Sequence, residues 1–111
     1  RGEETAGPPP SVKVVWSPLA ELRAGEAVDA IAADRPQAGA AWLDELLDRV
    51  ASLSRFAKRG RVVPEIGKAS YREIFQHPYR IVYRIDATRV VVLTIRHGRR
   101  EWDPAEVLGG A

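Results

Sequence analysis

Residues Tyr71–Arg100 read YREIFQHPYRIVYRIDATRVVVLTIRHGRR and contain three runs rich in β-branched and aromatic residues. Only the dipeptides His77-Pro78 and Ala87-Thr88 separate these runs. Because connections this short join only antiparallel neighbours, the pattern predicts a three-stranded meander. Its strands are expected at Tyr71–Gln76, Tyr79–Asp86 and Arg89–Arg96. A sheet of this size needs an apolar cover on one face, which the rest of the chain must supply.

Alternation along the strands predicts which side chains face that cover. We expect the core face to carry Ile81, Tyr83 and Ile85 from the middle strand and Val91, Leu93 and Ile95 from the last strand. The opposite, half-exposed face would carry Arg80 and Arg84, ~13 Å apart at ~3.3 Å per residue. Two arginines there are typical of a surface that meets anions. The alternative is that they only solvate the outer face, as is common in antiparallel sheets.

Length and composition indicate one domain, over residues 11–111, with enough apolar chain for a core. The polar, Pro-rich segment Arg1–Pro10 has no hydrophobic signal core, and we expect it to be disordered. Without cysteine the chain can form neither a disulfide scaffold nor a cysteine metal site, and no run approaches the ~20 apolar residues of a membrane span. We therefore predict a cytoplasmic protein.

Charge is distributed unevenly along the chain. The net charge is only +2, but residues 55–100 hold twelve Lys and Arg against three acidic residues. That segment carries +9 and the remainder −7. The asymmetry indicates an anionic partner for the second half, either nucleic acid or an acidic protein.

The first half of the chain predicts one strand and two helices. A strand is expected over Ser11–Ser17, and Ser17-Pro18 is typical of a helix start, with Ser as N-cap and Pro at the first helical position. This helix should run to about Ala33, because the residue before Pro36 is disfavoured in a helix. A second helix, from Pro36 to about Leu53, has an apolar stripe at helical spacing. Joined so closely, the two helices should form an antiparallel hairpin that covers the sheet.

The order of elements predicts an α+β fold, β-α-α-β-β-β, with the first strand at an edge of a four-stranded antiparallel sheet and the helical hairpin on one face. The long basic connection Ser54–Ser70 should anchor itself in the core through Phe56. A connection of this length is often functional. The Gly-rich end, Ala105–Ala111, is expected only to terminate the chain.

Five short motifs occur in a characteristic order along the chain. They are VVWSPLA at Val14–Ala20, GRVVPEIG at Gly60–Gly67, YRE at Tyr71–Glu73, PYRIVYRI at Pro78–Ile85 and RHGRRE at Arg96–Glu101. In this order and spacing, the chain resembles the RelE/ParE superfamily of toxins from bacterial type II toxin–antitoxin modules over residues 12–103. The superfamily's β-α-α-β-β-β fold agrees with the elements expected here.

The resemblance is strongest to the ParE branch, through PYRIVYRI and HGRRE. It implies a toxin that poisons DNA gyrase by binding it, and is not itself an enzyme. A ParD-like antitoxin, wrapping a helix and an extended tail around it, would silence the toxin and provide its only link to operator DNA. The RelE branch implies the alternative, a ribosome-dependent endoribonuclease of messenger RNA. A third alternative is a non-toxic member that only binds a partner.

Cleavage of RNA through the 2′-hydroxyl needs a base, a cation for the phosphate and an acid. Resemblance to one nuclease sub-branch would assign Glu65, Arg80 and His97 to these roles. Each has a structural alternative: Glu65 could neutralise the basic loop, and His97 could satisfy a backbone carbonyl. The lysine-rich second strand and the late tyrosine of RelE-type nucleases are absent, since YREIFQ has no lysine and no tyrosine follows Arg100.

For a gyrase-binding toxin, we expect the target or the antitoxin to contact the basic face and tail. These residues are Arg61, Arg80, Arg84, Arg96, Arg99, Arg100 and Trp102. Trp102 could stack on a nucleic-acid base or dock the C-terminus onto the fold or the antitoxin. The two histidines, His77 and His97, have no metal-ligand spacing, and we expect neither a metal nor a cofactor.

Overall fold

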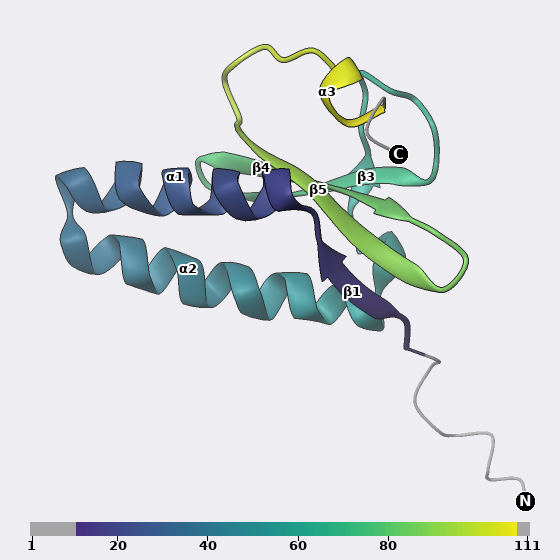
Figure 1. Cartoon of the computed structure of the whole chain (residues 1–111), viewed down its shortest axis with the longest axis horizontal. Coiled ribbons are helices and arrows are strands. Elements are labelled where there is room, and N and C mark those ends of the chain that lie inside the picture. The colour runs from purple at the N-terminus through teal and green to yellow at the C-terminus, as the bar shows by residue number, and fades with distance from the viewer. Residues whose placement is uncertain (1–10, 109–111) are drawn as a thin grey trace, which may run out of the picture.

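Two long helices lie side by side over one face of a five-stranded sheet (Figure 1). The computed structural model describes residues 11–108, so the disorder predicted for Arg1–Pro10 lies outside the described residues. The elements are β1 (Lys13–Trp16), α1 (Pro18–Asp34), α2 (Pro36–Ala51), the 3₁₀ turns η2 (Ser52–Ser54) and η3 (Ala57–Arg59), β2 (Arg61–Val62), β3 (Tyr71–Gln76), β4 (Tyr79–Ile85), β5 (Arg89–His97) and α3 (Ala105–Leu108). The predicted α+β class is confirmed. Within residues 11–108 no helix has the length and apolar content needed to span a membrane.

The sheet has the strand order β1-β5-β4-β3-β2 and is mixed. The meander of β3, β4 and β5 is antiparallel and the first strand joins its edge, both as predicted. However, β1 runs parallel to β5, so the expectation of an entirely antiparallel sheet is wrong. No short turn joins these two strands, and nothing in their connection therefore forces them to be antiparallel. The fifth strand, β2, is only two residues long, too short to give a recognisable pattern.

Local signals set the boundaries of the helical hairpin. The Ser17 hydroxyl accepts a hydrogen bond from the Ala20 amide at 3.0 Å and also donates to the Leu93 carbonyl at 3.0 Å. It thereby caps α1 and joins the start of the helix to the sheet. Small side chains on α1 and larger ones on α2, among them Trp42 and Leu46, pack on the apolar face of β3, β4 and β5. This packing forms the main core.

A β-bulge in β5 changes which side chains face the helices. Val82 pairs with Thr94, whereas the next residue, Tyr83, pairs with Val92, so Leu93 is the extra residue. Ile95 lies in the main core as predicted, but Val91 and Leu93 lie on the opposite face. The prediction for these two residues is wrong because it assumed strict alternation along the whole strand.

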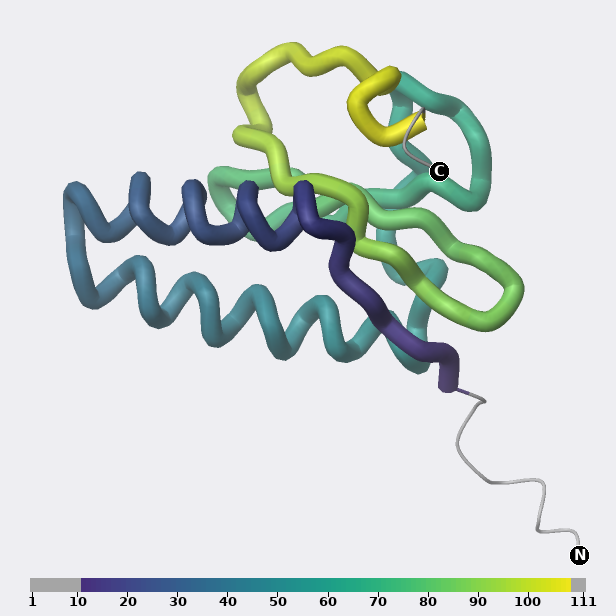
Figure 2. The backbone as a smooth tube through the Cα atoms, viewed as in Figure 1, coloured from purple at the N-terminus to yellow at the C-terminus, as the bar shows by residue number. Residues whose placement is uncertain are grey.

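The opposite face of the sheet is covered by a second, smaller core. It consists of Val63, Val82, Val91, Leu93, Trp102 and Val107. Figures 1 and 2 show the C-terminal segment with α3 beside the loop that precedes β3. The expectation that this face is half-exposed is therefore wrong, because residues 63–66 and 102–107 pack on it. The expectation that Ala105–Ala111 only terminates the chain is also wrong over its described part, since Val107 is buried.

The turn after α2 is held by a residue other than the one expected. Phe56 was predicted to be the core anchor of the basic connection, but it is 56% exposed. Leu53, in η2, is fully buried instead. The two consecutive 3₁₀ turns direct Leu53 inward and leave Phe56 on the surface.

Candidate functional site

Arg80 lies at the centre of a buried ionic cluster on the second face of the sheet. It is 6% exposed, and its two terminal nitrogens bind both carboxylate oxygens of Glu65, at 2.8 and 2.7 Å. Its Nε donates to Glu73 at 2.7 Å, and the other oxygen of Glu73 accepts from Arg61 Nε at 2.6 Å. Strand alternation explains the arrangement, because Glu73 and Arg80 lie on the same face of neighbouring antiparallel strands.

Trp102 connects this cluster to the C-terminal segment. Its indole N–H donates to Glu65 at 3.2 Å, and the Arg80 guanidinium carbon lies 5.7 Å from the centroid of its ring. The contact is a cation–π arrangement with a largely desolvated arginine. The Arg80 cluster is defined as Glu65, Glu73, Arg80, Arg61 and Trp102. It joins the loop between β2 and β3, the sheet, and the segment that follows β5. This agrees with the expectation that Trp102 docks the C-terminus onto the fold.

The contacts within the Arg80 cluster shift its ionisation equilibria. The bidentate hydrogen bond from Arg80 lowers the pKa of Glu65 from 4.5 to about 2. The same bond with Glu65 raises the pKa of Arg80 above its ordinary value. A carboxylate with so low a pKa is a weak base. An arginine whose Nε and both terminal nitrogens already donate to carboxylates has little capacity left for a phosphate.

His97 lies on the opposite side of the sheet from the Arg80 cluster. It pairs with Tyr79 across β4 and β5, and the two rings pack edge to face at 5.4 Å. Tyr79 in turn packs against Trp42 in the main core at 5.3 Å. The backbone N–H of Arg99 donates to His97 Nδ1 at 3.3 Å, which holds the ring at the turn after β5. The structure thus brings Glu65 and Arg80 together and places His97 on the other face.

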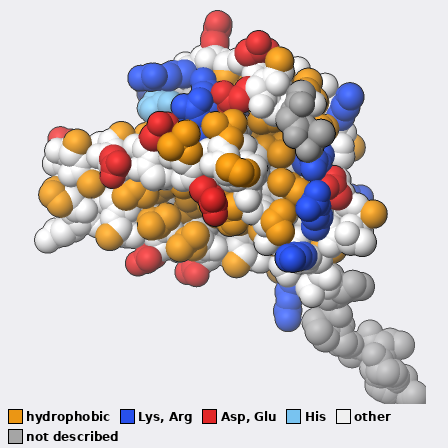
Figure 3. Space-filling view, viewed as in Figure 1, with side chains coloured by type: hydrophobic (Ala, Val, Ile, Leu, Met, Phe, Trp, Pro, Cys, Tyr) orange, Lys and Arg blue, Asp and Glu red, His pale blue; other side chains and the backbone are white. Residues whose placement is uncertain are grey.

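The remaining arginines of the predicted basic surface differ in how far they are already paired. Arg84 binds Asp86 at 2.8 Å, which raises the pKa of Arg84 and lowers that of Asp86. Arg96 binds Glu106 at 3.3 Å. Arg99 and Arg100 are exposed in the turn that follows β5, and neither side chain forms an ion pair with another residue of the described range 11–108. In Figure 3, Lys and Arg side chains gather beside a histidine above the helical hairpin.

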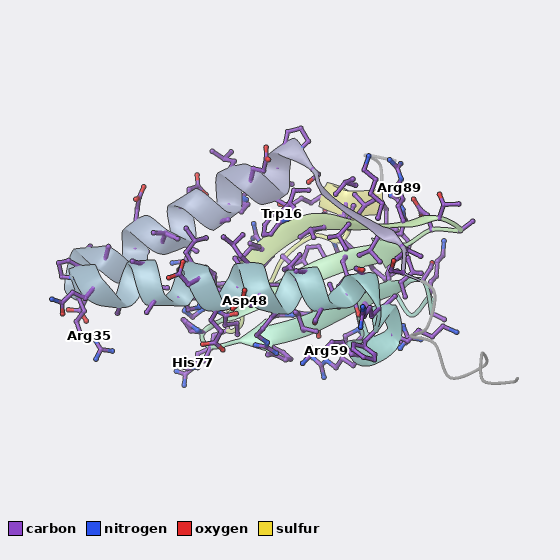
Figure 4. All side chains as sticks on the ribbon, turned by 90° about the horizontal axis from the view of Figure 1, so that it is seen from below. Trp16, Arg35, Asp48, Arg59, His77 and Arg89 are labelled. Atoms are coloured by element: carbon purple, nitrogen blue, oxygen red, sulfur yellow. The ribbon has the colours of Figure 1, made fainter. Side chains whose placement is uncertain are left out.

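A separate apolar groove lies between α1 and α2. Its volume is about 470 Å³, and its lining residues include Trp16, Val28, Leu43 and Leu47. Figure 3 shows the hydrophobic side chains of this face between the helices, with acidic side chains around them, and Figure 4 shows Trp16 where β1 meets the helices. Sequence reasoning missed the groove because it assigned the whole apolar side of the hairpin to the sheet. The sequence signal for the groove was the i, i+4 pair Leu43 and Leu47, because a second apolar stripe on a helix needs a second partner to cover it.

No metal centre can be assigned within residues 11–108, where no group of three or more His, Cys, Asp or Glu side chains is positioned to hold an ion. The candidate site therefore consists of the Arg80 cluster, the free arginines after β5 and the apolar groove. Of these, the free arginines and the groove are accessible to a partner.

Comparison with known proteins places this arrangement in a family. Residues 14–102 match the model of the ParE toxin of type II toxin–antitoxin system, parDE. The fold is similar to that of a chromosomal ParDE toxin–antitoxin system from P. aeruginosa, with a TM-score of 0.66 and 16% identity over 78% of this chain and 96% of that one. It is also similar to a RelBE toxin–antitoxin complex from Mycobacterium tuberculosis, with a TM-score of 0.55 and 23% identity over 78% of this chain and 98% of that one. No curated protein matches the sequence. Because the family model covers most of the chain, the protein belongs to the family of ParE toxins of type II toxin–antitoxin systems.

Proposed function

We propose that this toxin acts by binding and inhibiting DNA gyrase, as the ParE branch does, and not by cutting RNA. The observation that carries the proposal is the division of the three candidate nuclease residues between two faces of the sheet. Glu65 and Arg80 are bonded to each other on one face, and His97 packs against Tyr79 on the other.

RNA cleavage by this set would require a base, a phosphate-binding cation and an acid within reach of one phosphodiester. Here the cation is enclosed by two carboxylates and an indole ring. Withdrawing Arg80 to bind a phosphate would leave the Glu73 carboxylate buried without its main cation, which is costly. The Arg80 cluster therefore stabilises the fold. An inhibitor that acts by binding does not need a base, a cation and an acid positioned around one phosphodiester.

The surface proposed for target contact is the turn after β5, where Arg99 and Arg100 carry guanidinium groups free to bind acidic side chains. Reversing both charges, Arg99→Glu with Arg100→Glu, is expected to abolish growth inhibition. The concentration needed for half-inhibition of gyrase supercoiling should rise at least about tenfold, or ~1.4 kcal/mol. The fold should persist, because both side chains are exposed.

The measurement is a supercoiling assay with purified gyrase and the antitoxin-free toxin. The control variant, Arg35→Glu with Arg55→Glu, reverses two other exposed charges and should inhibit gyrase as the wild type does. A wild-type protein that leaves gyrase active but cleaves messenger RNA on ribosomes would overturn the proposal in favour of the nuclease alternative. Normal growth of cells expressing the wild type without antitoxin would indicate a member that only binds a partner.

The antitoxin is proposed to bind the apolar groove between α1 and α2. Glu21 and Asp29 lie among the groove residues, so charge complementarity favours an amphipathic helix with basic residues beside its apolar face. Leu47 is 48% exposed there, and a partner helix would bury it.

Leu47→Glu should weaken binding of a ParD-like antitoxin by about 100-fold, because it places a carboxylate in an apolar contact. Leu22→Glu is the matched control, since Leu22 is 58% exposed on α1 and does not line the groove. The measurement is the dissociation constant of the purified complex. Equal affinities for the two variants would show that the antitoxin binds elsewhere.

A further inference from the structure

A second, smaller pocket lies where α1 passes the end of β5, and it combines apolar walls with cationic groups. Its volume is about 250 Å³. Ala27, Ala30 and Ile95 contribute apolar surface, and Arg23 and Arg96 contribute guanidinium groups. This volume is below the roughly 300–1,000 Å³ typical of pockets for drug-sized ligands. It suits a single side chain.

The two arginines at this pocket have unused hydrogen-bonding capacity. The Nε atoms of both Arg23 and Arg96 are buried and have no hydrogen-bond partner within the described part of the chain. Both guanidinium groups share one carboxylate oxygen of Glu106, at the long distances of 3.5 and 3.3 Å. A buried donor without a hydrogen-bond partner destabilises the fold. An added anion that repositions either guanidinium into a bidentate pair would remove this cost.

The pocket also has a third cation and one acidic residue. Arg100, exposed and without an ion pair among residues 11–108, lines the pocket, as does His97. Glu26 also lines the pocket, and it binds Arg23 at 3.2 Å. The charges are therefore arranged to accept one anionic group, with an acidic residue beside it that would repel further negative charge.

We propose that this pocket binds an aspartate or glutamate side chain of a partner protein, with the guanidinium groups of Arg23 and Arg96 holding its carboxylate. Carboxylate is the group that both arginines already bind through Glu106. The alanine and isoleucine walls would accommodate the methylene groups of such a side chain. A nucleic-acid backbone fits less well, because its neighbouring phosphates would meet Glu26. The inference does not depend on gyrase being the target.

The test uses a fluorescein-labelled peptide of alternating Glu and Leu, the same peptide with Gln in place of Glu, and a ten-nucleotide single strand of thymidylate. Fluorescence anisotropy with the full chain should give a Kd for the Glu peptide at least tenfold below that for the Gln peptide. Arg23→Gln and Arg96→Gln should each raise the Kd of the Glu peptide about tenfold. Arg35→Gln, at the exposed tip of the helical hairpin (Figure 4), should leave it unchanged.

A second measurement keeps the test decisive if Arg96→Gln disturbs the fold by freeing Glu106. In the ¹⁵N-labelled wild type, the Nε–H signals of Arg23 and Arg96 should shift as the Glu peptide is added, and the signal of Arg35 should not. Unshifted signals, or equal affinity of the wild type and Arg23→Gln, would overturn the proposal. The proposal would also be overturned if the Glu peptide did not bind and the oligonucleotide bound in a way that depends on Arg23. The pocket would then be a phosphate site.

Discussion

Arg80→Met is expected to lower the free energy of unfolding by about 3–5 kcal/mol, as removal of one partner from a buried ion pair does. The variant leaves the Glu73 carboxylate, which is 1% exposed, with Arg61 as its remaining cation. Arg61 is itself 56% exposed at its side chain and so compensates poorly for the lost partner. Glu65 and Trp102 would lose their contacts with Arg80 at the same time. The measurement is chemical denaturation at pH 7.

The double variant Arg80→Met with Glu73→Leu distinguishes the stability lost through an unpaired buried charge from the stability lost through poorer packing. Replacing both partners by apolar side chains leaves no buried charge behind, so this variant should recover most of the stability lost in Arg80→Met. A single variant within 1 kcal/mol of the wild type would show that Arg80 contributes little. If the double variant were less stable than Arg80→Met, the other contacts of Glu73 would contribute more to stability than its pairing with Arg80 does.

Acid provides an independent readout of the same cluster. The folded-state pKa of Glu65, about 2, lies below its ordinary value of 4.5, so the unfolded chain binds the proton more readily. The stabilisation from ionised Glu65 is therefore fully present above pH 4.5 and is lost as the pH falls towards 2. Arg80→Met removes the main cause of the shift, and its stability should depend less on pH across this window.

Much of the fold follows from signals that are local in sequence. Ser17-Pro18 and Arg35-Pro36 mark the helix boundaries, and the short breaks at residues 77–78 and 87–88 require the hairpins of the meander. Each of these depends on a few adjacent residues and on backbone sterics. For that reason the helices and the antiparallel strands were predicted to within about two residues of their observed ends, which is the usual ambiguity of a helix or strand end.

The candidate site was less predictable because its contacts join distant parts of the chain. Arg80 reads as an outward-facing strand residue, and only the packing of Glu65 and Trp102 over that face buries it. The bulge at Leu93 likewise has no local signature in a run of apolar residues. The sequence pattern singles out Glu65, Arg80 and Trp102 one by one, but their pairing depends on which loop and tail cover the sheet. Sequence patterning does not specify that coverage.

Gly60→Ala is expected to destabilise the protein by about 1–3 kcal/mol or more, as overpacking of a tight site does. A Cβ atom at this position would lie 2.5 Å from the Glu73 carbonyl oxygen and 2.6 Å from the Tyr83 hydroxyl. The carbonyl belongs to β3, so relief would require the backbone to move. That movement would disturb the Gly60 amide, which donates to the Tyr83 hydroxyl at 3.0 Å, and the adjacent pairing of β2 with β3.

The same substitution at Gly25 is the matched control and should have the opposite sign. Gly25 lies within α1, and a Cβ atom there would meet nothing within 4 Å. Alanine should stabilise the helix by about 0.5–1 kcal/mol, because glycine loses more conformational freedom on folding. Thermal or chemical denaturation of the two variants tests both predictions together. If Gly60→Ala proved as stable as the wild type, β3 could not approach residue 60 as closely as described, and the edge strand β2 would have to pair differently.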